Sequence, residues 1–482
     1  MDWGSVFDDA GDRSRDETSM ASIASVSIAS LNEEIEVGET RSTRAAHQLI
    51  SFSLSRSLSF NPADIGASSN YSPVIAYSFT VNYILGVGSL GVPYALYKAG
   101  IVFGSALLVF VSFVSYITVM WVSETTTRAR ELDAKNSKTK LLRDPYHFPE
   151  VTTLCDRFLG VVGATLYQVC LLGLMYGGLL GYSQVFVNSI VSQLPVFDGS
   201  NAVVAAIFGI IVVPLSCVDL NEQIHVQVAM AIVRFFALTT MVVSASVALF
   251  TDAKDSGALY PIQTPYTSEV PFVDFKSFGL LFSTTVFSQL FQHSVPGLLA
   301  PLARKDQAKA SSIFGYALLT TTLFYLALSL SCCYYFGPKI SSSVNLNWAS
   351  FTWGIEGTMP IWARFLSFLV VLFPALDTLS VFPLIAITLG DNLVASLKVA
   401  AIPPLVIAVL VTDLSVTLQF SGIFGIYVAF ITPALLQLFS QREDPRTNIY
   451  SGPFSSENYV YAVLVFGGVS LLVATAQIFI HV

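Results

Sequence analysis

The chain has 482 residues, of which 54% are hydrophobic and only 12% are charged, and its net charge is −8. Soluble proteins average about 25% charged residues, so this composition excludes an ordinary soluble protein. Uncharged stretches such as 99–123 and 310–338 are long enough to cross a bilayer, which needs about 20 apolar residues. The sequence therefore predicts an all-α polytopic membrane protein in contact with the lipid bilayer, and nothing in it indicates a nucleic-acid partner.

Residues 1–68 are predicted to form a disordered cytoplasmic N-terminal tail. They are rich in Ser, Thr, Asp and Glu, so they cannot bury enough apolar surface to fold alone. Within the tail, 51–62 alternates apolar and polar residues and is a candidate for docking on the membrane surface or on the helix bundle. Residues 1–20 are polar and acidic, unlike a cleavable signal peptide, so we expect the first membrane helix to target the protein.

Residues 69–482 form the predicted transmembrane domain. Eleven spans are expected, near 71–97, 100–122, 158–191, 201–218, 227–250, 278–301, 311–336, 360–389, 398–412, 415–438 and 459–480. The third is too long for one upright helix, so we expect it to tilt or protrude.

The distribution of Lys and Arg predicts the orientation of the chain. With the tail in the cytoplasm, 18 of these residues fall on the cytoplasmic side and five on the other, while Arg234 lies within the fifth span. The N-terminus is therefore predicted to be cytoplasmic, and eleven spans place the C-terminus in an extracellular or lumenal compartment. The plasma membrane and an endomembrane both fit, since no convincing sorting signal is present.

The first span contains the stretch NYILGVGSLGVPY, which interrupts its own helix. Gly86, Gly88, Gly91 and Pro93 lie in its middle, and each glycine costs about 1 kcal/mol and each proline about 3 kcal/mol in a helix interior. The sixth span carries a similar interruption in FSQLFQHSVPGLLAP, residues 287–301. Broken helices at matching positions of two halves are typical of secondary transporters built from inverted repeats.

A broken helix frees backbone groups that can bind a ligand. Amides that begin the second half-helix suit a carboxylate, and carbonyls that end the first suit an ammonium group or Na⁺. The competing interpretation is that these glycines only allow close packing. The predicted substrate-binding residues are Gly86, Gly88, Ser89, Leu90, Gly91, Phe287, Gln289 and Phe291 of the two breaks. Tyr176 in the third span is a candidate for the pocket wall or for packing alone.

Asp377, His293 and Arg234 lie well inside predicted spans. Asp377 has 12 uncharged residues before it and 13 after, a depth at which a carboxylate is usually functional. It is expected to carry a proton or bind an ion or amine, or else to be a protonated acid bonded to a neighbouring helix. His293 at the second break is a candidate for gating or proton transfer, or a core histidine. Arg234 is expected to pair with an acid such as Asp219 or Glu222, or to reach towards the cytoplasm.

These stretches resemble the amino acid/auxin permease family. The similarity is carried by 71–100, 287–305, 381–392 and 413–427. It implies a LeuT-like fold, with a five-plus-five inverted repeat and one extra C-terminal helix, and symport of amino acids.

The resemblance also implies ion ligands. In sodium-coupled members the first-helix asparagine and an eighth-helix threonine bind Na⁺, which here designates Asn82 and Thr378. The spacing of Thr378 and Ser380 to Phe382-Pro383 differs from that pattern, and Asp377 stands beside them. The ion-coupling candidates are thus Asn82, Asp377, Thr378, Ser380 and His293, with H⁺ and Na⁺ both open.

No HExxH, GxSxG or Walker motif is present, so we do not expect an enzyme or a cofactor. The predicted function is secondary active transport of amino acids, most simply neutral ones, by alternating access. The alternative is a transporter-like sensor or scaffold that binds amino acids and signals to cytoplasmic partners through its N-terminal tail.

Overall fold

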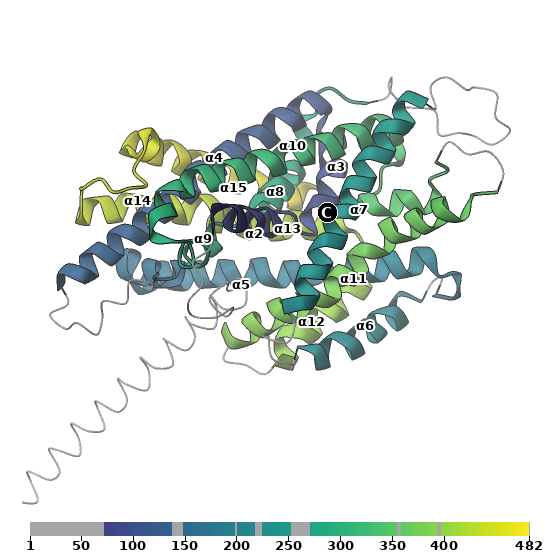
Figure 1. Cartoon of the computed structure of the whole chain (residues 1–482), viewed down its shortest axis with the longest axis horizontal. Helices are drawn as coiled ribbons and strands as arrows, with labels where there is room; N and C mark the ends of the chain where they lie inside the picture. The colour runs from purple at the N-terminus through teal and green to yellow at the C-terminus, as the bar shows by residue number, and fades with distance from the viewer. Residues whose placement is uncertain are drawn as a thin grey trace, which may run out of the picture. The chain divides into compact units, whose positions relative to one another are not determined.

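The computed structural model describes residues 72–136, 148–197, 200–216, 224–251, 270–353, 358–392 and 397–481, and these ranges contain helices but no β-strand. The predicted tail, with its segment 51–62, lies outside them. The α-helices, labelled in Figure 1, are α2 (Pro73–Ile84), α3 (Gly88–Ala99), α4 (Ile101–Asn136), α5 (Val151–Gln193), α6 (Asn201–Leu215), α7 (Ile224–Thr251), α8 (Phe278–Gln289), α9 (Val295–Leu299), α10 (Ala310–Phe336), α11 (Ile361–Asn392), α12 (Leu397–Leu410), α13 (Leu414–Ile426), α14 (Thr432–Glu443) and α15 (Glu457–His481).

Local sequence signals set several helix ends. The Ser72 hydroxyl accepts a hydrogen bond from the Ile75 amide (3.4 Å), and Pro73 follows as the first helical residue, where its fixed φ suits a helix start. Gly100 separates α3 from α4 with φ +91°, and a Cβ there would lie 2.6 Å from the backbone of Phe272. Only glycine fits that turn.

Among the described residues, seven helices are long and apolar enough to cross a bilayer, and the bent pair α2 and α3 forms an eighth candidate span. The other predicted spans correspond to shorter elements. The helix α6 has 15 residues and α12 has 14, which gives about 21 to 23 Å at 1.5 Å per residue, less than a hydrocarbon core of about 30 Å. The chain is a multi-pass membrane protein, whereas eleven spans and an inverted repeat remain predictions.

The third predicted span is longer than its apolar run. The helix α5 begins at Val151 rather than at residue 158 and comprises 43 residues. Gly160 interrupts it with φ 70° and ψ −175°, backbone angles that an L side chain rarely adopts. The prediction placed the start too late because the polar first turns of α5 carry no hydropathy signal.

Helices distant in sequence pack around the two broken spans (Figure 1). The helix α3 contacts α8 and α10, and α8 also contacts α13. The helix α5 contacts α11 and α13, while α7 contacts α10 and α11. Small residues permit the close approaches: a Cβ on Gly422 of α13 would overlap the backbone of Ser283 in α8.

Candidate functional site

The predicted interruption of the first span is present. The helix α2 ends at Ile84, α3 begins at Gly88, and the two half-helices are bent by 57°. Gly91 and Pro93, expected to contribute to the break, instead lie within α3. The break itself is the short segment from Leu85 to Val87.

The sixth span is also broken as predicted, slightly earlier than its proline suggested. The helix α8 ends at Gln289, and a 3₁₀ turn, Gln292–Ser294, contains His293. Pro296 lies in the first turn of α9. The amides of the first turn have no partner within the helix, so a proline there removes no helical hydrogen bond. The break therefore precedes the proline.

One tyrosine links the two breaks. The Tyr325 hydroxyl of α10 lies 2.8 Å from the backbone oxygen of Ile84 and 3.1 Å from that of Ser288, so its proton is positioned to be shared between them. Tyr325 is fully buried. It ties the end of α2 to the last turn of α8, and sequence patterning had not singled it out.

Two glycines of the first break face different surroundings. A Cβ on Gly88 would lie 2.6 Å from the Ser288 hydroxyl and 3.0 Å from the ring of Phe287 and the Cα of Ser288. Close packing between α3 and α8 therefore explains this glycine, as the competing interpretation held. Among the described residues, and apart from its chain neighbours, a Cβ on Gly86 would find only the Tyr182 hydroxyl within 4 Å, at 3.8 Å. Gly86 is thus the position whose missing side chain leaves space.

An ion pair lies against the first break. Arg234 of α7 and Asp377 of α11 are both buried, with Nη2 of the arginine 2.6 Å from Oδ1 of the aspartate. The other terminal nitrogen, Nη1, donates to the backbone oxygens of Leu85 (2.8 Å) and Asn82 (3.2 Å) and approaches Oδ1 of Asn82 (3.3 Å). The expectation that Arg234 pairs with an acid is confirmed, but its partner is Asp377. Asp219 and Glu222 lie outside the described residues.

This pairing also bears on Asp377. The prediction left it either as a functional carboxylate or as a protonated acid bonded to a neighbouring helix. Its 2.6 Å contact with the guanidinium of Arg234 shows that it bonds a neighbouring helix, while its role in ion coupling stays a prediction.

A small cavity lies between the break and the ion pair. Its volume is about 10 Å³, room for about one water molecule. An amino acid would enter only if the surrounding helices separated. The lining residues are Gly86, Val87, Ser89, Leu90, Tyr182, Arg234, Phe373, Pro374, Asp377 and Thr378.

The amides expected to hold a carboxylate are partly used within the break. The Gly86, Ser89 and Leu90 amides donate to the backbone oxygens of Ile84 (2.8 Å), Gly86 (3.0 Å) and Val87 (3.1 Å), respectively. Short local turns replace the helical pattern here. A carboxylate that used these amides would have to displace those bonds.

Other predicted site residues lie apart from the cavity. Gln289 donates to the Thr322 hydroxyl (3.2 Å), and the buried ring of Phe291 packs edge-on to Phe314. Tyr176 is half-buried on α5.

The remaining ion-coupling candidates differ in their contacts. His293 is half-buried, and its Nδ1 has no hydrogen-bond partner in the described part of the chain. Thr378 lines the cavity and donates to the backbone oxygen of Ala375 (2.8 Å). Ser380 lies on α11, and its side chain is outside the described set. Across the described residues, no three His, Cys, Asp or Glu side chains gather as a metal site.

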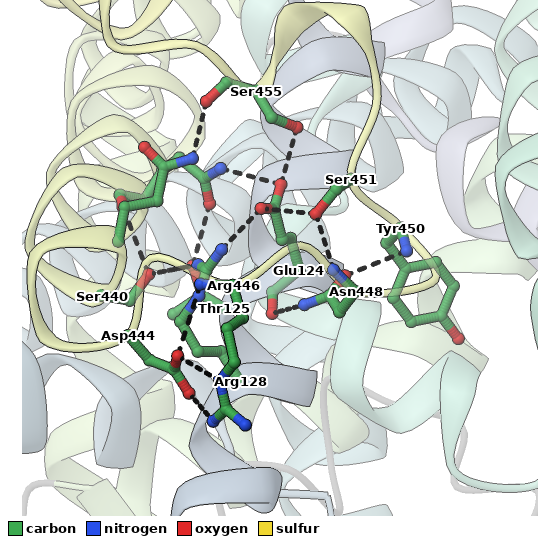
Figure 2. Close-up of polar contacts among 12 residues, drawn as sticks. Glu124, Thr125, Arg128, Ser440, Asp444, Arg446, Asn448, Tyr450, Ser451 and Ser455 are labelled. Carbon is green, nitrogen blue, oxygen red and sulfur yellow. Dashed lines mark hydrogen bonds and ion pairs between the residues drawn. The ribbon is translucent and has the colours of Figure 1, made fainter.

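A second polar cluster, which we had not predicted, surrounds Glu124 of α4 (Figure 2). Only 1% of Glu124 is exposed. Its carboxylate accepts hydrogen bonds from Arg128 (2.6 Å), Gln437 (2.8 Å), Ser451 (2.8 Å) and Ser455 (2.8 Å). It thereby fastens α4 to α14 and to the segment before α15. The available signal was an acid and an arginine four residues apart directly after the uncharged run 99–123.

The sequence of the chain is similar to those of known proteins. A family model described as transmembrane amino acid transporter protein matches residues 69–479. Similar proteins include Transmembrane protein 104 of Mus musculus, 23% identical over 499 residues that cover 85% of this chain and 96% of the relative. Its homologues in Caenorhabditis elegans (23% identical, covering 68% of this chain and 70% of the relative) and Dictyostelium discoideum (21%, covering 86% and 98%) also match.

These matches confirm the family that the sequence resembled, and the three similar proteins are each Transmembrane protein 104 or a homologue of it. The family description names transporters rather than enzymes. The chain therefore belongs to the family of transmembrane amino acid transporter proteins.

Proposed function

We propose that this chain is a secondary active transporter that moves neutral amino acids across a membrane by alternating access, as a symporter driven by an ion gradient. The observation that carries the proposal is the first break: a bent pair of half-helices beside a cavity, with a buried ion pair against it. Family membership supports the amino acid as substrate.

The charges around the cavity favour a substrate with no net charge. Arg234 and Asp377 line it and neutralise each other. A zwitterion brings one carboxylate and one ammonium group, and it leaves this balance unchanged. A cationic or anionic amino acid would add an uncompensated charge to a buried site, which is costly.

The helix contacts suggest which parts would move together. Tyr325 holds both breaks, so α2, α8 and α10 are expected to travel as one unit. In the predicted LeuT-like arrangement, spans 1, 2, 6 and 7 rock against spans 3, 4, 5, 8, 9 and 10. The bonds from Arg234 to Asn82 and Leu85 cross that boundary. Rocking would have to loosen them and would enlarge the cavity.

Proteoliposome uptake of a pooled set of labelled amino acids tests the proposal. A pH gradient, a Na⁺ gradient or neither is imposed, and wild type is compared with Asn82→Ala and Asp377→Asn. Uptake driven by H⁺ and abolished in Asp377→Asn would identify a proton-coupled transporter. Uptake driven by Na⁺ and lost in Asn82→Ala would identify sodium coupling.

The position of the site has its own test. Gly86 lines the cavity, so Gly86→Leu adds a side chain there. Gly468→Leu on α15 is the control, since a Cβ there would have no atom of another described segment within 4 Å. We expect uptake to be lost in the first variant and kept in the second. Undiminished uptake in Gly86→Leu would rule out substrate binding at this break.

A further inference from the structure

The oxygens at the end of the first half-helix resemble a set of cation ligands. The backbone oxygens of Asn82 and Leu85 and the amide oxygen of Asn82 converge on one point, which Nη1 of Arg234 occupies. Carbonyls at the C-terminal end of a helix carry partial negative charge and favour cations. In transporters with broken helices, such oxygens coordinate the coupling ion.

We propose that the guanidinium of Arg234 is a tethered cation that fills this set of oxygens, so that transport by this chain does not use Na⁺. The inference rests on the proposed function and decides between the two coupling ions that it left open. Asn82 is a cation ligand as predicted, but the cation is the guanidinium of Arg234 rather than Na⁺.

Two properties of Arg234 favour its occupation of these oxygens over Na⁺ in this conformation. Its guanidinium cannot lose its proton at physiological pH, unlike an ammonium group in a similar place. Its other terminal nitrogen, Nη2, lies 2.6 Å from Oδ1 of Asp377. Only 9% of Arg234 is exposed. A Na⁺ ion at these oxygens would need the space of Nη1 and would face the remaining positive charge.

Removal of the guanidinium should therefore create a Na⁺ site, which the wild type lacks. In Arg234→Ala the three oxygens at the end of α2 would be released. The carboxylate of Asp377 would lose the guanidinium and could supply the negative charge that a cation requires. Thr378, which also lines the cavity, adds a hydroxyl oxygen nearby. Oxygen atoms of these kinds are ligands for hard cations.

The experiment measures Na⁺ binding without substrate, on the purified full-length chain in detergent. Bound ²²Na⁺ and the midpoint of thermal unfolding are followed as NaCl replaces choline chloride at constant ionic strength. Wild type and Arg234→Lys, which retains a cation, should bind no saturable Na⁺ and show no shift. Arg234→Ala should bind saturably, with at least a tenfold higher signal and a raised midpoint. The double variant Arg234→Ala/Asp377→Ala should lose most of this response.

Saturable Na⁺ binding by the wild type would overturn the proposal, and so would an Arg234→Ala protein that shows no Na⁺ response. If Arg234→Ala does not fold, Arg234→Gln replaces it, and the wild-type titration stands by itself. Because no readout involves an amino acid, failure of this inference is distinguishable from failure of the proposed transport. The latter would appear as absent uptake with the Na⁺ results unchanged.

Discussion

The ion pair between Arg234 and Asp377 gives a quantitative prediction about stability. Asp377→Ala would leave a buried guanidinium without its counter-ion, a change that typically costs 3 to 5 kcal/mol. Nη1 would keep its bonds to Asn82 and Leu85, so we expect the lower end, about 3 kcal/mol. That free energy corresponds to roughly a 150-fold change in the unfolding equilibrium, since 1.36 kcal/mol is a factor of ten.

The assay is unfolding in mixed micelles titrated with SDS, and the comparison is the neutral double variant Arg234→Met/Asp377→Leu, which removes both charges. Its cost should be smaller than that of Asp377→Ala, because no charge remains buried. Lys309→Ala is the control, since it breaks a pair with Asp306 in which the lysine side chain is 61% exposed; such pairs contribute about 0 to 1 kcal/mol. If Asp377→Ala costs no more than this control, the buried pair does not have the assigned role.

Gly88→Ala should destabilise the protein and abolish uptake, because its Cβ would lie 2.6 Å from a hydroxyl of α8. Gly178→Ala should retain stability and uptake in the same assays, because its Cβ would meet no atom of another described segment within 4 Å. Tyr325→Phe removes one donor from two buried carbonyls and should cost about 1 to 3 kcal/mol by SDS unfolding; an unchanged midpoint would contradict its bridging role. Glu124→Gln should lower the free energy of unfolding by about 3 kcal/mol in that assay, because four hydrogen-bond donors would no longer face a charged acceptor. Glu443→Gln, whose side chain is 48% exposed, should cost less than about 1 kcal/mol, and equal effects of the two would refute the assignment.

The sequence predicted the two broken helices well, because glycine and proline act through backbone conformation, which is local. Gly86 and Gly88 lie at the first break, and His293 and Ser294 lie in the second. Pro296 does not break the helix, since a proline is tolerated in the first turn. The helix of the third span is longer than the predicted 158–191, because hydropathy does not detect a helix that continues into polar residues.

The site itself depended on information that the sequence does not carry locally. Arg234 and Asp377 are 143 positions apart, and which face of each helix meets the other depends on packing across the whole bundle. Two isolated charges of opposite sign within apolar spans were nevertheless a usable signal for a pair. Tyr325 gave no such signal, because a tyrosine in a membrane helix is ordinarily read as packing.

Solute counterflow tests the central claim, amino acid transport, most directly, because it requires no knowledge of the coupling ion. Proteoliposomes that contain the full-length chain are loaded with a mixture of unlabelled amino acids and diluted into trace amounts of each labelled one. The account predicts transient accumulation of at least one neutral amino acid, and its loss in Gly86→Leu but not in Gly468→Leu. If no amino acid accumulates while the purified chain still binds one, the transporter account is contradicted and the chain is better explained as a sensor that signals through its tail.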